Sequence, residues 1–204
     1  MSWRESVALS PPASHRGENY WARPVPSFGD PRARLVVVGL APAANGGNRT
    51  GRMFTGDRSG DFLFAGLYRA KFANQPSSTA IDDGLILRDC FVTAALRCCP
   101  PENRPTTEER DNCSSYLERV LDLLRNKRVV LCLGAFAYDA TWRALSNASS
   151  PKKPKFAHGG MVLISDHGVS LVCSYHPSQR NVFTGLLTPK MFDDVLRLAD
   201  TRLG

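Results

Sequence analysis

The stretch RLVVVGLAPAANGGNRTGRMFTGD, residues 34–57, combines the clearest strand signal of the sequence with its most unusual loop. It begins with RLVVVGL (34–40), an unbroken apolar run rich in β-branched residues, which is typical of a strand buried on both faces of a parallel sheet. The rest, residues 41–57, is a glycine-rich loop that supplies Phe54 and Asp57 close together. Loops longer than about 12–15 residues without secondary structure of their own are usually functional, so this loop is the first candidate site.

Segments of strand and helix character alternate along the rest of the chain. Further strands are predicted at 90–98, 128–134 and 169–177, with a short extra strand at 161–165, and helices at 60–73, 106–126, 135–145 and 188–203. This alternation predicts an α/β fold in which a parallel sheet is covered by helices on both faces. Ligands in such sheets bind beyond the carboxyl ends of the strands, where the glycine-rich loop would lie.

Length and composition predict one domain over residues 1–204, with the Pro-rich residues 1–34 as an irregular N-terminal arm. The chain has 43% hydrophobic and 22% charged residues, which is typical of a folded, soluble protein. A net charge of +7 favours a polyanionic partner such as nucleic acid. No apolar run reaches the ~20 residues that span a bilayer, and the N-terminus lacks the apolar core of a secretory signal, so we expect a cytoplasmic protein.

The glycine-rich loop has the composition of a pocket for a flat ligand. Gly46, Gly47 and Gly51 permit close approach of a ligand to backbone N–H groups. The loop contains no lysine and fits neither the P-loop nor the G-x-G-x-x-G pattern, which disfavours simple binding of nucleotide phosphates. Phe54 alone fits a core residue as well as a stacking platform. Its position beside the glycines and Asp57 favours the stacking platform.

A second loop, SYHPSQRNVFTGLLT (174–188), follows the last strand of the predicted sheet, and we call it the HPSQRN loop. His176 lies at the end of that strand, and Pro177 restricts the turn after it. An isolated histidine is more often structural than catalytic, but a position at the carboxyl edge of a parallel sheet favours a role in the site. The polar residues 178–181 are suited to contact a phosphate backbone or a groove.

These two loops resemble the signature motifs of the uracil-DNA glycosylase superfamily, most closely those of the family 5 enzymes. The stretches YWARPVPSFGDP (20–31) and RCCPPENRPTTEERDNC (97–113) are similar to the same family, so the resemblance covers essentially the whole chain. It implies a three-layer α/β/α sandwich around a four-stranded parallel sheet. It also implies an enzyme of base excision repair. Such an enzyme flips uracil, or another deaminated base such as hypoxanthine or xanthine, out of DNA and hydrolyses the N-glycosidic bond to leave an abasic site.

The resemblance implies roles for individual residues of the two loops. Cleavage of the N-glycosidic bond places positive charge on the sugar and negative charge on the departing base. His176 is the candidate hydrogen-bond donor to that base, and Asp57 is the candidate that orients water or stabilises the cation. The candidate residues are, as catalytic groups, Asp57, His176, Asn45 and Asn103; as substrate-binding groups, Gly39, Ala41, Phe54 and Ser178; and as DNA-binding groups, Arg49, Gln179, Arg180 and Asn181.

Two positions bear on the catalytic groups that the resemblance implies. Ala41 stands where many superfamily members carry Asp or Asn, and the family 5 enzymes likewise lack that side chain, so the first motif contains no evident general base. Asn45 stands where family 5 members usually carry His. Asparagine can orient a water molecule but is a poor proton acceptor at neutral pH. Asn103 matches the family, although a turn residue after Pro100–Pro101 is an equally good interpretation.

The same resemblance implies a [4Fe–4S] cluster held by four cysteines. Cys98 and Cys113 match one pair, whereas Trp3–Glu5 match the stretch just after the C-x-x-C of the other pair, which this sequence lacks. Four thiolates are the usual requirement, so we expect the cluster to be incomplete or missing in this chain. We expect Cys98 and Cys113 to approach each other near Trp3–Glu5, and Cys132 and Cys173 to be buried apolar residues.

Two other functions fit parts of the same pattern. A catalytically weakened nucleic-acid-binding module of the same fold would account for Ala41 and Asn45. A nucleoside or nucleotide N-glycosidase could use the same pocket on a free substrate, without the steep salt dependence of DNA binding. The positive net charge and the polar tip at 176–181 favour DNA containing uracil or another deaminated base as the partner, and we expect a monomeric enzyme.

Overall fold

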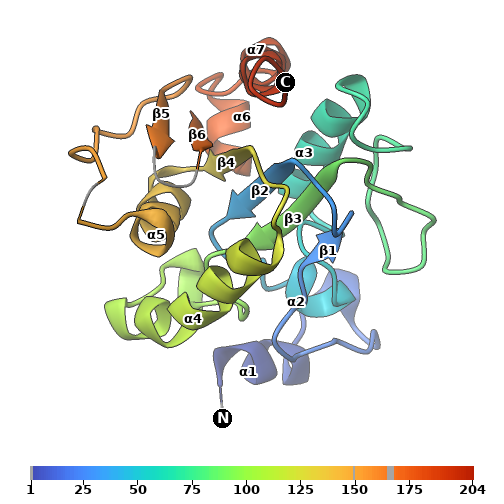
Figure 1. Cartoon of the computed structure of the whole chain (residues 1–204). Coiled ribbons are helices and arrows are strands. Elements are labelled where there is room, and N and C mark those ends of the chain that lie inside the picture. Colours follow the sequence, from blue (N-terminus) through green and yellow to red (C-terminus); the bar gives the residue numbers. More distant parts are fainter. Residues whose placement is uncertain (1, 149, 165–167) are drawn as a thin grey trace.

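The computed structural model of the protein describes residues 2–148, 150–164 and 168–204. In these ranges one mixed sheet runs through the molecule in the order β1-β3-β2-β4-β6-β5 (Figure 1). Its strands are β1 (Phe28–Gly29), β2 (Leu35–Gly39), β3 (Cys90–Ala94), β4 (Val129–Leu133), β5 (Met161–Ile164) and β6 (Val169–Ser174). Strands β2, β3, β4 and β6 pair in parallel, which confirms the four strands predicted for the core.

Two short antiparallel strands extend this four-stranded core to six strands within the described ranges. β5 pairs with β6 at the segment predicted as an extra strand, although residue 165 of that segment lies outside the described residues. β1 pairs with β3 at the opposite edge. The prediction of four strands missed β1 because two residues are too few to show an alternation of apolar and polar positions.

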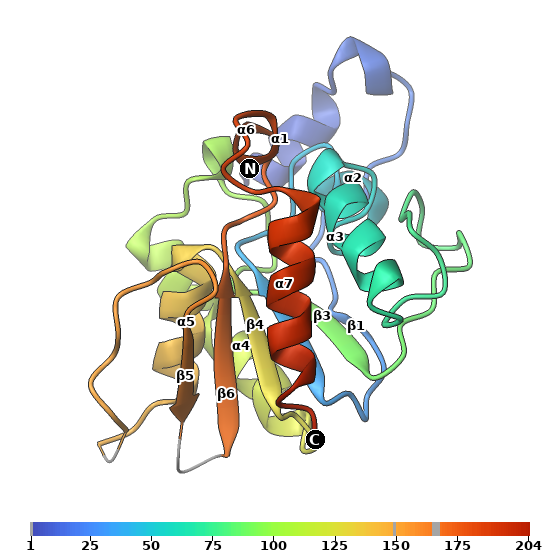
Figure 2. The ribbon, with the colours of Figure 1, turned by 90° about the horizontal axis from the view of Figure 1, so that it is seen from above.

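Helices cover both faces of the sheet. The helices of the described ranges are α1 (Trp3–Leu9), α2 (Gly47–Thr50), α3 (Arg58–Arg69), α4 (Thr107–Leu123), α5 (Ala135–Leu145), α6 (Gln179–Phe183) and α7 (Pro189–Asp200), with the 3₁₀ turns η1 (Ala13–His15) and η2 (Pro101–Asn103). Figure 2 shows α3 and α7 side by side over one face, whereas α4 and α5 cover the other. The predicted three-layer α/β/α sandwich is therefore confirmed. Within the described residues, no helix is both long and apolar enough to cross a membrane.

Strand β2 shows why the sheet forms the centre of the core. All of its residues are buried, as predicted for the run RLVVVGL. Leu35 and Val37 join the apolar cluster beneath α3 and α7, whereas Val36 and Val38 join the cluster beneath α4 and α5. Because alternate side chains of a strand face opposite layers, a strand covered on both sides requires an apolar residue at every position.

The N-terminal arm is more ordered than its Pro-rich composition indicates, so the prediction that residues 1–34 are irregular is wrong in part. The arm contains α1, η1 and β1. Helix α1 begins after Ser2, whose backbone N–H donates to the Glu5 carboxylate at 3.1 Å, as in a capping box. The Ser-x-x-Glu signal is present in the sequence, but a helix of 7 residues is too short for an apolar period to reveal it.

The two candidate loops leave the same edge of the sheet. The glycine-rich loop follows β2 and the HPSQRN loop follows β6, with β4 between these strands. The chain passes from β2 to β3 on one side and later to β4 on the other, so the strand order reverses at β2. Ligands of open α/β sheets bind at such a point, beyond the carboxyl ends of the strands. The glycine-rich loop, predicted without secondary structure, contains the single turn of α2.

Candidate active site

A cavity of about 610 Å³ lies at the carboxyl edge of the sheet, between the two loops. The glycine-rich loop, the start of α3, the turn η2 and the HPSQRN loop all contribute to its wall. Most of the residues predicted for the site line it, namely Ala41, Phe54, Asp57, Asn103, His176, Ser178, Gln179 and Arg180. Folding therefore gathers three separate parts of the chain around one hollow.

Phe54 packs between the two loops. Its ring lies over Gly39, where a Cβ atom would overlap the ring, so Gly39 makes room for Phe54 instead of lining the cavity. The centroids of the Phe54 and His176 rings are 6.2 Å apart, at an interplanar angle of 30°. The left-handed φ of Phe54, 54°, indicates a backbone that its surroundings hold in place. Phe54 belongs to the apolar core and also to the cavity wall, so its place is compatible with both interpretations from the sequence, a core residue and a stacking platform.

Replacing Phe54 with alanine is expected to weaken binding of free uracil, because a flat ligand in the cavity would lose a stacking contact of about 1–3 kcal/mol. The measurement is the inhibition constant of uracil for wild type and variant, with thermal unfolding as the check that the variant is folded. Phe54→Leu preserves an apolar side chain without a flat face and is the matched control. Weaker uracil binding in both variants supports stacking, whereas an F54L variant that binds uracil as wild type would reduce Phe54 to a packing residue.

Asp57 ends the glycine-rich loop and begins a helix. Its Oδ1 accepts a hydrogen bond from the Gly60 N–H at 3.0 Å, the contact of an N-cap residue of α3. Its other oxygen lies against Gly46, where a Cβ atom would overlap it. Burial raises the pKa of Asp57, and the backbone N–H groups of Gly60 and Ser59 oppose that rise. The capping bond holds the carboxylate at the cavity wall and leaves acceptor capacity for a ligand or water.

His176 follows β6 and lines the cavity. Its carbonyl oxygen accepts a hydrogen bond from the Asn181 side chain at 2.8 Å, so Asn181 supports the HPSQRN loop and is absent from the cavity wall. Gly134, with a φ of +91°, allows the His176 side chain to pack closely against the end of β4. Burial lowers the pKa of His176 to about 4, so at pH 7 the ring is neutral and carries one N–H donor and one acceptor nitrogen.

The lowered pKa of His176 predicts a pH dependence of stability. This ring takes up a proton near pH 6.5 in the unfolded chain but only near pH 4 in the folded protein, so the unfolded state binds more protons between these values. The free energy of unfolding is therefore expected to fall by about 1–3 kcal/mol as the pH drops through this window. Urea unfolding at a series of pH values measures it, and His176→Gln should flatten the profile. An unchanged profile in H176Q would assign the effect to another group.

The predicted residues Asn45 and Arg49 lie beside the cavity and not in its wall. Exposed Asn45 accepts a hydrogen bond from the Tyr20 hydroxyl at 2.8 Å. Arg49 directs its guanidinium back into the protein, where it meets the Glu18 carboxylate at 2.6 Å. The same guanidinium donates to the carbonyls of Asn45 at 2.8 Å and Gly56 at 3.2 Å. Tyr20 and Glu18 belong to the N-terminal arm, so no local pattern around the loop reveals these contacts.

Sequence reasoning missed Arg58, which lines the cavity directly after Asp57 as the first residue of α3. Its guanidinium lies 5.5 Å from the centroid of the Phe183 ring, at the end of α6. Arg58 forms no ion pair in the part of the chain that the structure describes, so its charge is free at the cavity rim. The signal in the sequence was a cation immediately after the glycine-rich loop.

A buried polar network supports the turn at residues 53–57. Arg52, only 6% exposed, donates hydrogen bonds of 2.7 to 3.0 Å to three side chains: Asp83, Ser78 and Thr55. Asp83 and Ser78 belong to the loop 74–89 that connects α3 to β3. The backbone carbonyl of Ser78 also accepts a hydrogen bond from the Gly56 N–H at 2.9 Å. The network therefore fastens the loop 74–89 to the turn that carries the cavity residues.

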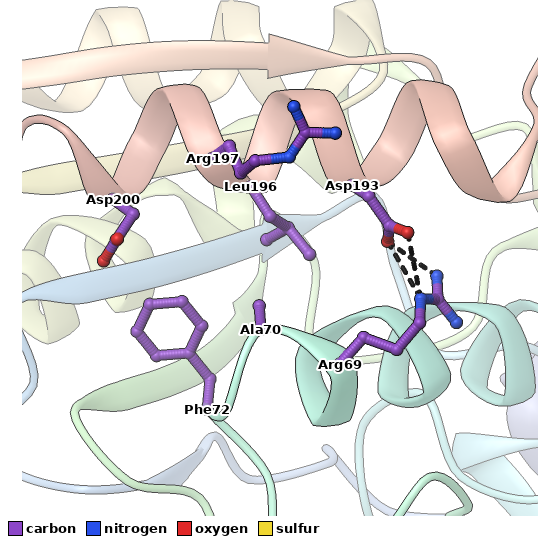
Figure 3. Close-up of a pocket in the computed structure, with 7 residues that line it drawn as sticks. All are labelled: Arg69, Ala70, Phe72, Asp193, Leu196, Arg197 and Asp200. Atoms are coloured by element: carbon purple, nitrogen blue, oxygen red, sulfur yellow. Dashed lines mark hydrogen bonds and ion pairs between the residues drawn. The ribbon is translucent and has the colours of Figure 1, made fainter.

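A smaller cavity of about 280 Å³ lies at the other end of α3, against α7. Figure 3 shows that its charged side chains come from these two helices and that Arg69 points toward Asp193, with a shortest hydrogen bond of 2.7 Å. None of the residues predicted for the site lines this cavity. Because Arg69 and Asp193 neutralise each other, the larger cavity, with its unpaired Arg58, is the stronger candidate.

Cys98 lies beside the N-terminal helix α1, where its Sγ accepts a hydrogen bond from Arg4 at 2.9 Å. Burial raises the pKa of Cys98; the Arg4 guanidinium opposes this rise, and the Cys113 thiol, which lies within electrostatic range, adds to it. Cys98 therefore lies beside the N-terminal helix with Cys113 in its surroundings, whereas the approach of both thiols to Trp3–Glu5 stays a prediction. Cys132 and Cys173 are buried in strands, which confirms the burial predicted for them.

The described residues do not fit a complete iron–sulfur cluster. They supply the thiols of Cys98 and Cys99 within range of Arg4 in α1, and Cys113 within range of Cys98, whereas four thiolates are the usual requirement. No group of three or more His, Cys, Asp or Glu side chains among the described residues is arranged to hold a metal ion. Cys98 instead accepts a hydrogen bond from Arg4, whose buried Nε has no hydrogen-bond partner among the described residues. The cluster implied by the family resemblance thus has no full ligand set in this part of the chain, and the chemistry proposed below uses protein side chains alone.

Comparison with known proteins gives matches over the whole of this architecture. A family model described as "Uracil DNA glycosylase superfamily" matches residues 26–199. The chain is 48% identical over 205 residues to the type-5 uracil-DNA glycosylase of Mycobacterium tuberculosis (strain CDC 1551 / Oshkosh). This alignment covers 100% of this chain and 76% of that protein. It is 46% identical over 204 residues to the type-5 enzyme of Pyrobaculum aerophilum, covering 86% of that protein. It is 45% identical over 206 residues to that of Thermus thermophilus, covering 91%.

The matched region includes the sheet, both loops and every residue that lines the large cavity. The family match covers most of the chain, and the relatives align with it from end to end. On these grounds the chain belongs to the uracil-DNA glycosylase superfamily.

Proposed function

We propose that this protein is a DNA glycosylase that hydrolyses the bond between a flipped uracil base and its sugar. The observation that carries the proposal is the cavity of about 610 Å³ in which Phe54, Asp57 and His176 meet. Relatives named type-5 uracil-DNA glycosylases are 45% to 48% identical to this chain over its full length. A base inside a duplex cannot be reached by a protein site, so an enzyme of this kind must hold the base in an enclosed pocket outside the stack.

The cavity wall has the character of a pocket for a flat base. Phe54 supplies an aromatic surface, Leu40 supplies an aliphatic one, and Ala41 and Ala43 supply small apolar surfaces. Ala41 has no side chain beyond Cβ, so it leaves the backbone of this loop open to the polar edge of a base. The Ser178 oxygen accepts a hydrogen bond from a backbone N–H in α6 at 3.2 Å and retains its own O–H as a donor for a ligand.

His176 is the proposed donor to the departing base. When the C1′–N1 bond breaks, its electron pair leaves with the base, and negative charge spreads onto the base oxygens. A neutral imidazole, favoured by the pKa of about 4, can donate its N–H to such an oxygen at pH 7. No protein group in the described ranges hydrogen-bonds to the ring of His176, so this donor is free for the ligand.

Asp57 is the proposed partner of the sugar and of the attacking water. A carboxylate near C1′ stabilises the positive charge that develops on the sugar. The water oxygen then bonds to C1′ while a proton of the water passes to Asp57 or to solvent. The pKa of Asp57, raised by burial, favours acceptance of that proton. Asn103, exposed at the cavity rim, is the proposed second contact of the water. Asn45 is less well placed because it lies outside the wall and is bonded to Tyr20.

The rim of the cavity carries the proposed DNA contacts. Gln179 and Arg180 are exposed there, and Arg180 makes hydrogen bonds within the described ranges only through its backbone. We propose that these two side chains enter a groove of the DNA and occupy the space that the flipped base leaves. Asn181 holds the backbone of this loop in place. Arg49 could meet a phosphate only after leaving the three acceptors that surround its guanidinium.

Replacing Arg180 with glutamine is expected to weaken binding to all DNA sequences alike and to lower the slope of log Kd against log salt concentration by about 1, because one phosphate contact is lost. Fluorescence anisotropy of a labelled duplex over a range of KCl concentrations measures this slope. Arg125→Gln is the matched control, since Arg125 is exposed near the opposite edge of the sheet, before β4. Equal slopes in wild type and R180Q would place Arg180 outside the interface.

The direct test of the function uses oligonucleotides that contain one uracil, hypoxanthine or xanthine, followed by alkali to cleave the strand at abasic sites. Strand breaks at uracil are the expected result. Tight binding to uracil-containing DNA without release of base would instead support the catalytically weakened module. Release of uracil from free deoxyuridine, without dependence on salt, would support the nucleoside N-glycosidase.

We further propose that residues 1–204 act as one domain and as a monomer, because a single chain supplies the whole wall of the cavity. The proposed substrate is uracil-containing or otherwise deaminated DNA, which places the enzyme with the DNA of the cell, in the cytoplasm.

A further inference from the structure

A second hollow, of about 240 Å³, lies directly beside the base cavity. Arg58 and Gln179 line both hollows, so the two meet at these side chains. The remaining wall of the second hollow comes from α3, through Asp61 and Phe62, and from the HPSQRN loop, through Pro177, Val182 and Phe183. None of the roles proposed above uses this second hollow.

Phe183 is the distinctive wall residue. It is 72% exposed, although it is an aromatic residue in a short helix held at its start by the Ser178 cap. The guanidinium of Arg58 lies over its ring at 5.5 Å from the centroid. A ring has two faces, so one face of Phe183 meets Arg58 and the high exposure leaves surface for a second flat partner.

We propose that the second hollow is a nucleotide subsite, in which the base next to the flipped one stacks on Phe183 and the phosphate between the two nucleotides lies against Arg58. This inference rests on the proposed function and deepens it, because it assigns a contact to the nucleotide that is not cleaved. Consecutive nucleotides are joined through one phosphate, and the two hollows are joined through Arg58, a cation without an ion pair among the described residues.

The charges around the second hollow fit this arrangement. Asp61 also lines it and repels a phosphate, so the anion belongs on the side that the two hollows share, next to Arg58. The uncharged base belongs on the apolar side, among Phe62, Val182 and Phe183. Stacking on an aromatic ring tolerates every base because each has a π-face, so the subsite favours a polynucleotide over a free nucleoside without selecting a sequence.

The test is a double-mutant cycle between Phe183 and the neighbouring base. Single-stranded oligonucleotides carry one 2′-fluoro-2′-deoxyuridine, whose electron-withdrawing fluorine destabilises positive charge on the sugar and so blocks cleavage. The nucleotide on its 5′ side, the nucleotide on its 3′ side, or neither is replaced by an abasic spacer. Kd is measured for wild type, F183A, F183W and the matched control L186A, since Leu186 is 46% exposed in the same loop but lines neither hollow.

For the wild type, a spacer on one side is expected to weaken binding roughly 5- to 150-fold, the range of one stack between a base and an aromatic ring. F183A should show no loss from that spacer, F183W should keep the wild-type loss, and L186A should behave as wild type. The side on which the loss appears assigns the strand polarity. Equal spacer penalties in wild type and F183A, or no penalty on either side, would overturn the subsite.

The phosphate contact is tested with an uncharged methylphosphonate at the linkage between the two nucleotides. Wild type should lose affinity for this DNA relative to the normal linkage, whereas Arg58→Gln should bind both linkages equally. Equal losses in both proteins would overturn the assignment of Arg58. Release of uracil by the wild type tests the proposed function separately. If uracil is released but the spacer penalty does not depend on Phe183, only the subsite is contradicted. If the penalty depends on Phe183 but no uracil is released, the glycosylase activity is contradicted and the subsite stands.

Discussion

Replacing His176 with alanine is expected to slow the release of uracil from DNA by about 10²-fold, because the departing base loses the only neutral ring donor proposed for it. His176 lines the cavity at the end of β6 and its ring makes no hydrogen bond within the described ranges, so truncation breaks no hydrogen bond of the fold. Single-turnover kinetics on a uracil-containing oligonucleotide measure the step, since product release does not limit them.

His176→Gln is the informative companion variant. Its side-chain amide is a neutral donor, so H176Q should release uracil faster than H176A. If position 176 were needed only for packing, the two variants would not differ in this way. Binding of the uncleaved 2′-fluoro analogue should change far less than the rate, because the proposed contact strengthens as charge develops on the base. An H176A variant as fast as wild type would remove His176 from the chemistry.

Replacing Asp83 with asparagine is expected to lower the free energy of unfolding by about 3–5 kcal/mol, because it leaves the charge of Arg52 buried without a counter-ion. The two side chains are 7% and 10% exposed, and their closest atoms lie 2.7 Å apart. The carboxylate also accepts hydrogen bonds from three backbone N–H groups, those of Thr79, Ala80 and Leu85. For a chain of this size the loss corresponds to a fall in Tm of roughly 6–20 °C, which calorimetry measures.

The matched control is Asp193→Asn. Asp193 forms an ion pair with Arg69 (Figure 3) at 2.7 Å, the same distance, but these two side chains are 31% and 42% exposed. Exposed pairs contribute about 0–1 kcal/mol, so D193N should unfold close to wild type. A D83N variant as stable as D193N would show that the buried pair does not hold the loop 74–89 against the site.

The buried pair also predicts an acid limb of stability. Burial by itself would raise the pKa of Asp83, but the Arg52 guanidinium and the backbone N–H groups outweigh it and lower the pKa to about 2. The stabilisation is therefore complete above the unfolded value of 3.8 and is lost as the pH falls from there toward 2. D83N lacks this group, so its free energy of unfolding should vary less than that of wild type across this window.

The core of the fold could be predicted because burial imposes a local pattern on the sequence. A strand covered on both faces, such as β2, needs an apolar residue at every position, and helix α4 shows both an apolar stripe and the Thr106–Glu109 capping box. The meeting of the two loops could be predicted as well, since parallel strands end at the same edge of a sheet. The short elements α1, α2, α6 and β1 were missed because they contain too few residues to display a period.

The layers, the two loops and most of the residues that line the cavity could be predicted from the sequence. Contacts between distant segments set which side chains turn away from the cavity: Tyr20 and Glu18 of the N-terminal arm hold Asn45 and Arg49 outside the wall. Such contacts also place Arg58 over Phe183 and bury Arg52 against Asp83. A periodic pattern records whether each position faces solvent or core, whereas a contact between distant segments depends on how all the layers pack together, which no single segment specifies.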